Sequence, residues 1–315
     1  GVAGFIGYHT ASNLLDKNIK IIGIDNLNNY YDIKLKKDRL KELKKKYKKN
    51  FIFLKLDITN KQRLKNLFKK FKIETVINLA AQAGVRYSIY KPSVYLETNI
   101  NGFFNILDVS KNYKVKHFIF ASSSSVYGDQ KKYPIKESYE TSKPLSFYAA
   151  TKKTNEILAH SYSKIYKLKV SCLRLFTVYG PYGRPDMAPY KFTKAAFEKK
   201  PVKIFNKGKH ERDFTYVTDV ASSIIKLINK KPNKSFFQII NICSSKTVKL
   251  LDFIKCIEQI TNKKIIKKFV SKQKGDVIKT YGENKKLKKL IGIKKFVSIK
   301  NGMKKFIDWY VKYHV

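Results

Sequence analysis

Cysteine is scarce in this sequence, where Cys172, Cys243 and Cys256 are the only three among 315 residues. An odd number of widely spaced cysteines excludes a disulfide scaffold, and no Cys/His spacing typical of zinc occurs, so we expect no metal. The sequence has no apolar run of the roughly 18 residues that a membrane-spanning helix needs, and it does not begin with a secretory signal. These absences predict a cytoplasmic protein without membrane insertion.

Acidic residues and arginine are also few. The chain has 67 Lys or Arg against 23 Asp or Glu, which gives a formal net charge of +44. Such a charge is typical of proteins that bind nucleic acid or anionic surfaces. However, lysines occur along almost the whole chain, and only six cations are arginine, the residue whose planar fork reads phosphates and bases. We therefore predict no dedicated nucleic-acid partner, and a basic non-catalytic binding protein is the least favoured alternative.

Short apolar runs alternate with segments of helical spacing. The predicted strands lie near 20–25, 51–56, 74–80, 116–121, 168–175 and 237–242, and the predicted helices near 5–17, 33–48, 60–70, 93–113 and 146–166. This alternation predicts an α/β fold, a Rossmann-type doubly wound parallel sheet. We expect residues 1–175 to form this domain, a strand near 237–242 to rejoin its sheet, and residues 176–315 to form mainly a smaller C-terminal substrate-binding region.

The sequence opens with a glycine at every third position, Gly1, Gly4 and Gly7 in GVAGFIG. In a dinucleotide-binding turn such glycines allow a tight turn, close approach of the backbone to pyrophosphate and close helix packing. Asp25 ends the next apolar run, where a carboxylate accepts the ribose hydroxyls of NAD and repels the extra phosphate of NADP. We therefore expect NAD as cofactor. Because a strand normally feeds this turn, we also expect a first strand upstream of Gly1 that this sequence lacks.

Tyr148 and Lys152 are four residues apart in SFYAATKK, so they share one face of a predicted helix. A lysine ammonium beside a tyrosine favours the phenolate and lowers the tyrosine pKa, which makes a usable base. The serine-rich segment ASSSSVYG follows a predicted strand, at the sheet edge where ligands bind in open α/β folds. A serine there can bond a substrate hydroxyl and share its proton with Tyr148.

These motifs resemble, in type and order, the extended short-chain dehydrogenases/reductases that act on nucleotide sugars, and most closely the bacterial UDP-glucuronate 4-epimerases. Further matching segments are GIDNLNNYYD, LAAQAGVRYS, LRLFTVYGPYGRPDM, GKHERDFTYVTDV and KGDVIKTYG. The resemblance covers most of the chain. It implies NAD-dependent 4-epimerisation of a UDP-sugar, UDP-glucuronate to UDP-galacturonate, through a transient 4-keto intermediate with Tyr148 as base.

The resemblance also implies the residues of the site. The catalytic residues would be Tyr148, Lys152 and Ser123. The cofactor would be bound by Gly1, Gly4, Phe5, Ile6, Gly7, Asp25, Asn26, Asp57, Ile58, Ala80, Ala81 and Asn99, together with Tyr148 and Lys152. The substrate would be bound by Arg86, Ser124, Ser125, Thr177, Arg184, Arg212 and Asp276.

Ser124 and Ser125 stand where related dehydratases and decarboxylases carry acidic residues. Serine can hydrogen-bond a carboxylate but cannot exchange protons near neutral pH, which favours simple epimerisation. Thr177 and Arg184 would complete a set of donors for the sugar carboxylate. A UDP-glucose/UDP-galactose 4-epimerase is the main alternative, and a UDP-glucuronate decarboxylase is a weaker one.

Three further carboxylates are given no role at the site. Asp186, Asp213 and Asp219 are interpreted as turn or capping residues.

The segments 93–113 and 146–166 carry more apolar residues than one buried face needs. These residues include Tyr95, Ile100, Phe103, Phe104, Tyr162 and Ile165. Relatives pair these two helices across a two-fold axis, so we expect a homodimer.

Overall fold

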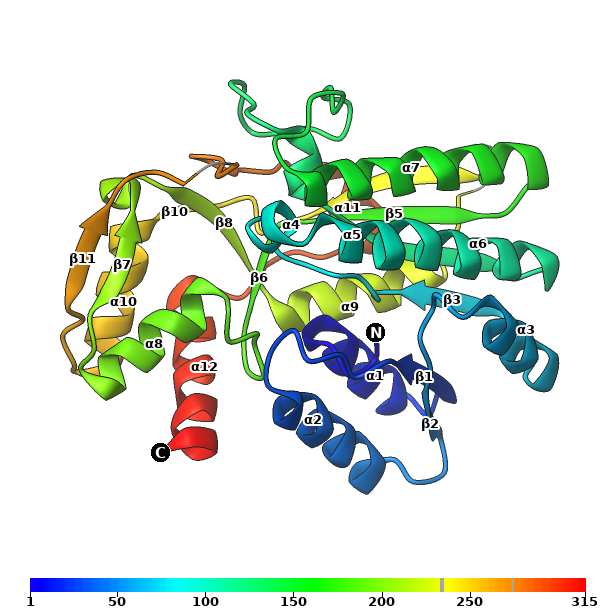
Figure 1. Cartoon of the computed structure of the whole chain (residues 1–315), viewed down its shortest axis with the longest axis horizontal. Coiled ribbons are helices and arrows are strands. Elements are labelled where there is room, and N and C mark those ends of the chain that lie inside the picture. The colour runs from blue at the N-terminus through cyan, green and yellow to red at the C-terminus, as the bar shows by residue number, and fades with distance from the viewer. Residues whose placement is uncertain (233–234, 274) are drawn as a thin grey trace.

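A parallel sheet with helices on both faces forms the larger part of the computed structural model, which describes residues 1–232, 235–273 and 275–315 (Figure 1). Its strands pair in the order β3 (Thr75–Asn78), β4 (His117–Ser123), β5 (Val170–Leu175) and β9 (Phe237–Ile242). β1 (Ile21–Asp25) and β2 (Phe51–Lys55) form a separate parallel pair. The α/β class and the Rossmann-type parallel sheet predicted from the sequence are confirmed.

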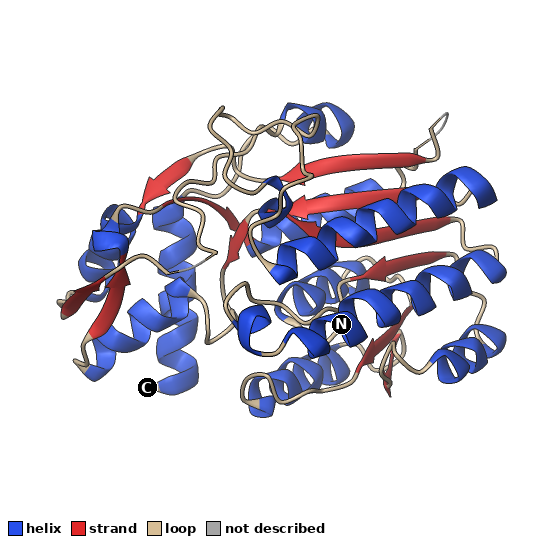
Figure 2. Cartoon of the chain, turned by 45° about the horizontal axis from the view of Figure 1, so that its top comes forward, coloured by secondary structure: helices blue, strands red, loops and turns tan. Residues whose placement is uncertain are grey.

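Alternation of side chains along β4 divides the core into two layers. Phe118 and Phe120 pack with α3, α6 and α7 on one face, whereas Ile119 packs with α1, α9 and α11 on the other (Figure 2). The bounds of these helices are α1 (Phe5–Leu15), α3 (Lys61–Lys70), α6 (Phe103–Asn112), α7 (Phe147–Tyr166), α9 (Val217–Ile228) and α11 (Lys285–Ile291). Because both faces of the sheet are covered, β4 and β5 are almost wholly buried and show no regular alternation of apolar and polar residues.

The helical segment predicted over 93–113 is divided into three pieces. α5 (Pro92–Tyr95) leads into a π-helical stretch, Leu96–Gly102, which is followed by α6. Asn99 lies in the π-helical stretch, is buried, and exchanges hydrogen bonds with the backbone of Gln82. π-helical turns are frequent at functional sites, and this one fixes the loop that follows β3.

The smaller part of the protein has its own apolar core. Two short sheets pair β7 (Val202–Phe205) with β11 (Lys267–Val270), and β10 (Thr247–Lys249) with β8 (Glu211–Tyr216) and β6 (Thr177–Tyr179). Packed against them are α8 (Ala188–Glu198), α10 (Leu250–Thr261) and α12 (Ile299–His314). Figure 1 shows this part beside the sheet, with the C-terminus on α12.

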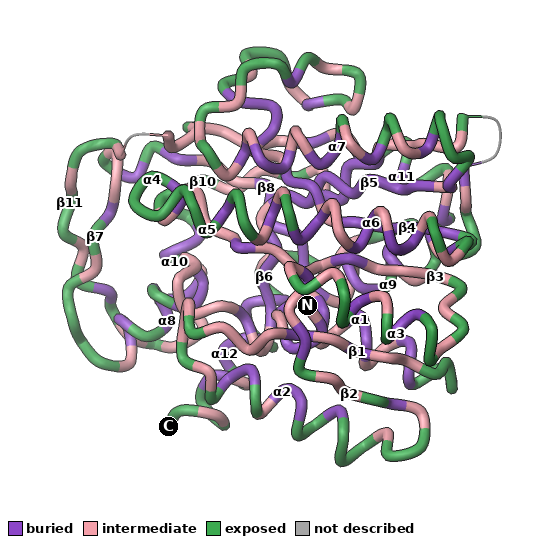
Figure 3. Tube along the Cα trace, turned by 45° about the vertical axis from the view of Figure 1, so that its right-hand side comes forward, coloured by how far each residue is buried: buried purple, intermediate pink, exposed green. Residues whose placement is uncertain are grey.

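The two parts interleave along the chain. After β6, the segments α9, β9 and α11 return to the large sheet, whereas α10 and α12 belong to the smaller part. No single boundary near residue 175 therefore separates them. In Figure 3 buried backbone runs through both cores, and exposed residues gather on the outer turns.

Two further helices belong to the larger part of the protein. α2 (Ile33–Lys46) begins after Asp32, whose carboxylate accepts from the backbone N–H of Lys34 at 2.8 Å. α4 (Tyr87–Tyr90) precedes α5 in the loop after β3.

Among the described residues, no helix is both long enough and apolar enough to cross a membrane. The strand predicted before Gly1 concerns residues outside this sequence and stays a prediction.

Candidate active site

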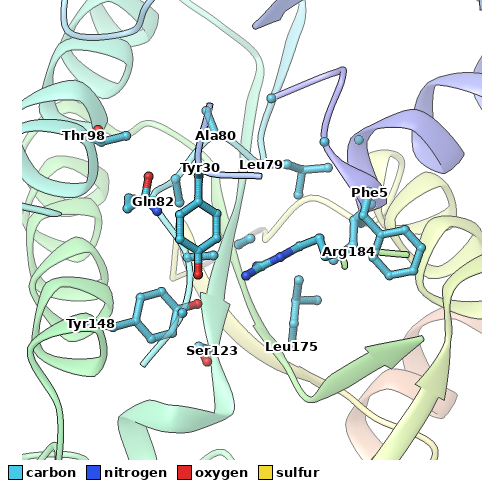
Figure 4. A pocket seen from close by; sticks show the side chains of 18 of the residues that line it. Phe5, Tyr30, Leu79, Ala80, Gln82, Thr98, Ser123, Tyr148, Leu175 and Arg184 are labelled. Carbon is cyan, nitrogen blue, oxygen red and sulfur yellow. The ribbon is translucent and has the colours of Figure 1, made fainter. Parts of the chain in front are cut away.

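A cavity of about 410 Å³ lies at the carboxyl ends of the large sheet's strands, where the smaller part meets them (Figure 4). Most residues predicted for the site line it. They are Gly1, Gly4, Phe5, Ile6, Gly7, Asp25, Asn26, Asp57, Ile58, Ala80, Ala81, Ser123, Ser124, Ser125, Tyr148, Lys152, Thr177 and Arg184. Segments far apart in the sequence thus converge at the edge where open α/β sheets bind ligands.

The glycine turn is packed too tightly for side chains. A Cβ on Gly7 would lie 2.0 Å from the carbonyl oxygen of Gly1, and a Cβ on Gly1 would lie 2.6 Å from the backbone nitrogen of Ala80. Gly4 is the N-cap of α1 and has no side chain to cap the first N–H groups of the helix. These N–H groups form a site for an anion such as the pyrophosphate of a dinucleotide.

Two carboxylates flank this turn. Asp25 is buried, and its two oxygens accept from the backbone N–H groups of Ala3 (3.1 Å) and Leu27 (2.9 Å). Asp57 accepts from the Asn26 side chain at 2.7 Å and from Thr59. Burial raises the pKa of Asp57, but these hydrogen bonds outweigh it and hold the pKa below its ordinary value. Both groups are therefore fixed acceptors, and the turn and carboxylates together fit a dinucleotide.

Tyr148 and Lys152 lie one turn apart near the start of α7, which Ser146 caps by accepting from the N–H of Ala149 at 3.1 Å. Burial raises the pKa of Tyr148, while the neighbouring Ser123 hydroxyl and the charge of Arg184 act in the opposite direction. Figure 4 shows Tyr148 beside Ser123, with Arg184 across the cavity. The tyrosine and the serine are thus placed to share one proton.

Lys152 was expected to lower the pKa of Tyr148, but its ammonium is engaged elsewhere in the structure. Its ammonium donates to the carbonyl oxygen of Ala121 at 2.7 Å, and burial lowers its pKa to about 8. The net pKa of Tyr148 lies above its ordinary value, and the cation that lowers it is Arg184. The reason is that Lys152 is engaged with the end of β4, whereas Arg184 projects into the cavity.

Ser123, the last residue of β4, and Ser125 form one hydrogen-bonded unit. Ser123 Oγ donates to Ser125 Oγ at 3.1 Å and accepts from the N–H of Ser125. Beneath them, Ser122 Oγ donates to Glu156 at 2.6 Å, and Glu156 is paired with Arg174 inside the core. Buried charges therefore hold the strand end that carries the serines.

Thr177 and Arg184 reach the cavity from the smaller part. Thr177 begins β6, and Arg184 lies in the loop between β6 and α8. Two backbone contacts hold this loop against the glycine turn. Buried Arg39 donates to the carbonyl oxygens of Ala3 (2.8 Å) and Tyr182 (2.6 Å), and His9 donates to that of Pro181 at 2.8 Å.

Four predicted site residues do not line the cavity. Asn99 acts through Gln82, which does line it. Arg86 pairs with Asp276 at 3.0 Å and covers the Phe205 ring, next to the cavity residue Val85. Arg212 donates to the carbonyl oxygens of residues 277 and 278. Arg86, Arg212 and Asp276 thus form a separate charged cluster beside the cavity.

Several residues that line the cavity were not predicted from the sequence. Asn28, Tyr30, Tyr31, Lys36, Gln82 and Met187 also line the cavity. Asn28, Tyr30 and Tyr31 stand in the segment GIDNLNNYYD, directly after a predicted strand, so their position at the sheet edge was the available signal.

The three carboxylates interpreted as turn or capping residues have different roles in the structure. Asp186 is paired with Arg184. Asp213 accepts from the N–H groups of Ser244, Ser245 and Gly282, and Asp219 accepts from that of Val297. Asp186 does lie in a turn, as interpreted, and its carboxylate in addition forms an ion pair at the cavity, which the interpretation did not include.

The parallel sheet carries a glycine turn, a buried carboxylate at the end of the next strand, and a Tyr/Lys pair beside a serine. Together these features define a dinucleotide-dependent enzyme of the short-chain dehydrogenase/reductase type. The chain belongs to the NAD dependent epimerase/dehydratase family, whose model matches residues 1–243. NAD is its cofactor. The glycine turn, Asp25 and Asp57 are the residues here that fit it.

Similar proteins cover nearly the whole chain. A UDP-glucuronate 4-epimerase of Thermodesulfobacterium geofontis is 43% identical over 98% of this chain and 94% of its own length. Protein CapI of Staphylococcus aureus is 43% identical over 100% of this chain and 98% of its own. The crystal structure of UDP-glucuronic acid 4-epimerase from Bacillus cereus with UDP-glucuronic acid and NAD has a TM-score of 0.92, at 32% identity over 100% and 98% of the two chains.

Proposed function

We propose that the protein epimerises UDP-glucuronate at C4 to give UDP-galacturonate. The observation that carries the proposal is that Tyr148 and Ser123 line the same cavity as Arg184, which is the single arginine lining it among the described residues. Asp186 occupies one edge of this guanidinium, and the remaining Nη1 edge suits a carboxylate, whereas a neutral sugar offers it only hydroxyl groups. The names of the relatives at 43% and 32% identity support the same substrate.

The chain's own groups move the proton. In the proposed reaction Tyr148 takes the proton of the C4 hydroxyl as a phenolate, the form that the charge of Arg184 favours against the effect of burial, and Ser123 bonds the same oxygen and orders the transfer. Bound NAD supplies the acceptor and donor of hydride at C4. Tyr148 then returns its proton to the oxygen of the 4-keto sugar after the sugar has turned, so the configuration at C4 inverts and nothing is consumed.

The serine unit separates epimerisation from the related reactions. Elimination of water needs an acid and a base near the sugar ring. Ser124 and Ser125 follow Ser123 and can only donate or accept hydrogen bonds. We propose that they hold the sugar carboxylate together with Thr177.

The charged cluster beside the cavity is proposed to bind the rest of the substrate. Arg86 and Arg212 provide cationic groups for the diphosphate, and Asp276 can accept from the uridine ribose. The coupling of Arg86 with Asp276 at 3.0 Å keeps these groups within reach of one another.

The experiment is incubation of the full-length protein with UDP-glucuronate and, separately, with UDP-glucose, followed by NMR of the products. We expect UDP-galacturonate from the first, and loss of this product in Tyr148→Phe, which removes the proton acceptor and keeps the ring. Preference for UDP-glucose would refute the role of Arg184. A pentose product would refute the serine argument. Steeply salt-dependent RNA binding, with no turnover of either sugar that depends on Tyr148, would favour the basic binding protein.

We also propose a homodimer through the face formed by α5, the π-helical stretch and α7. Exposed apolar side chains on this face are Val94, Leu96, Ile157, Ile165 and Tyr166. Tyr95 and Phe103, which were expected there, are instead buried in the core, since their spacing points them inward. A sedimentation mass equal to one chain at micromolar concentration would contradict the dimer.

A cytoplasmic location is proposed as well, in keeping with three free cysteines.

A further inference from the structure

Arg184 already has a carboxylate partner within the chain. Its Nε donates to Asp186 Oδ1 at 2.9 Å and its Nη2 donates to Asp186 Oδ2 at 2.5 Å. Asp186 is held in turn by Tyr30, whose hydroxyl donates to Oδ2 at 3.2 Å from the loop after β1. Among the described residues, Arg184 Nη1 has no hydrogen-bond partner, so one edge of the guanidinium stays available.

The surroundings make this pairing necessary. The Arg184 side chain is only 19% exposed, and its guanidinium lies 5.6 Å from the centre of the Tyr30 ring. Figure 4 shows Tyr30 and Arg184 together inside the cavity. A buried guanidinium without a counterion is costly, because desolvation is not repaid by any attraction. In the free protein, Asp186 supplies this counterion.

The proposed reaction makes an unusual demand on such a site. Hydride leaves one face of C4 and must return to the other, so the 4-keto sugar has to turn between the two transfers. Its carboxylate must then release Arg184 during the turn. If the sugar were the only counterion, that release would expose a bare buried cation, and the turn would be slow.

We propose that Asp186 is the resident counterion of Arg184, which keeps the guanidinium neutralised while the acidic sugar turns. The carboxylate of the sugar binds the free Nη1 edge, in addition to Asp186 rather than in its place. Asp186 acts through Arg184 and is a positioning residue, and Tyr30 fixes its orientation. The inference rests on the proposed function, since only an acidic sugar needs to be released in this way.

The test is Asp186→Asn in the full-length protein, which removes the charge and keeps the size. The unpaired guanidinium should bind UDP-glucuronate more tightly and release it more slowly. We expect both the KM and the calorimetric dissociation constant for UDP-glucuronate to fall, and kcat to fall by roughly tenfold. Reduced cofactor should accumulate during turnover, seen by its near-ultraviolet absorbance. Binding of UDP-glucose should not tighten.

Three variants serve as controls. Asp186→Glu keeps the charge and should restore most of kcat. Tyr30→Phe removes one hydrogen bond but no charge, so it should show a smaller effect in the same direction. Asp129→Asn, an exposed carboxylate paired with Lys131, should behave as wild type. Thermal unfolding of each variant confirms that it is folded.

Three results would overturn the proposal. A raised KM with unchanged kcat in Asp186→Asn would overturn the proposal, since the residue would then only orient Arg184 for binding. Equal changes for UDP-glucuronate and UDP-glucose would also overturn it, because no carboxylate would be involved. If the wild-type protein neither binds nor converts UDP-glucuronate, the proposed function fails and this inference fails with it.

Discussion

Removal of the buried ion pair beneath the serines should destabilise the protein strongly. Arg174 donates to both oxygens of Glu156, at 2.9 and 2.7 Å, and the two side chains are each 2% exposed. Glu156→Gln keeps the shape of the side chain but removes its charge. It also turns an N–H group toward the guanidinium N–H groups, so one hydrogen bond is lost and a buried cation is left uncompensated.

The expected fall in Tm follows from the free-energy cost of breaking this ion pair. Breaking a buried pair by removing one partner costs about 4 kcal/mol. With roughly 2.1 cal/mol/K of unfolding entropy per residue, a chain of 315 residues gains about 0.66 kcal/mol/K on unfolding. Dividing the first quantity by the second gives a fall in Tm of about 6 °C.

The assay is thermal unfolding followed by circular dichroism at neutral pH, under identical ligand conditions for each variant. Glu140→Gln, at an exposed position, is the matched control and should leave Tm within about 1 °C of wild type. The double variant Glu156→Leu with Arg174→Met should recover much of the loss, because both buried charges are then gone. A fall of less than about 1 °C in Glu156→Gln would refute this account of the core.

Three further predictions test other parts of the structure. Gly7→Ala should purify with little bound NAD, measured by absorbance after protein denaturation, because its Cβ would lie 2.0 Å from the Gly1 oxygen; unchanged NAD content would contradict the packing of the turn. Burial lowers the pKa of His117 to about 4, so the stability it contributes is complete above its unfolded pKa of about 6.5 and is lost as pH falls toward 4. His117→Gln should therefore unfold with a weaker pH dependence in that window, by up to about 1.4 kcal/mol per pH unit, and an identical pH dependence would count against a buried neutral histidine. Arg184→Met removes the cation that lowers the Tyr148 pKa, so the acid limb of its pH–rate profile should move to higher pH, and a shift to lower pH would contradict that electrostatic role.

The large sheet could be predicted because its strands are apolar on both faces. Runs such as HFIFASS contain Phe118, Ile119 and Phe120 in sequence, and both helix layers need apolar partners. The glycine turn could be predicted because its spacing reflects a local steric demand. The smaller part gave weaker signals, since β6, β7, β10 and β11 have only three or four residues each and leave little periodicity to detect.

The contacts of Tyr30, Asp186 and Arg184 with one another could not be predicted from the sequence. Tyr30 and Asp186 are 156 residues apart, and no local pattern indicates that their loops meet. Asp186, two residues after Arg184 in a Pro/Gly-rich segment, has the pattern of a turn residue. Only the folded loop shows that its carboxylate faces the guanidinium. The same holds for Lys152, whose engagement with the Ala121 carbonyl depends on how closely α7 approaches β4.

The interleaving of the two parts limits how substrate range can change. The chain leaves the sheet after β5, returns through α9 and β9, leaves again into β10 and α10, and returns once more at α11 before it ends in α12. No contiguous stretch therefore encodes the smaller part alone, so this part cannot be exchanged between relatives as one segment. The cavity residues in the loops after β1, β3, β4 and β6 are instead separate positions on one shared scaffold, so the lining of the cavity can be altered one loop at a time.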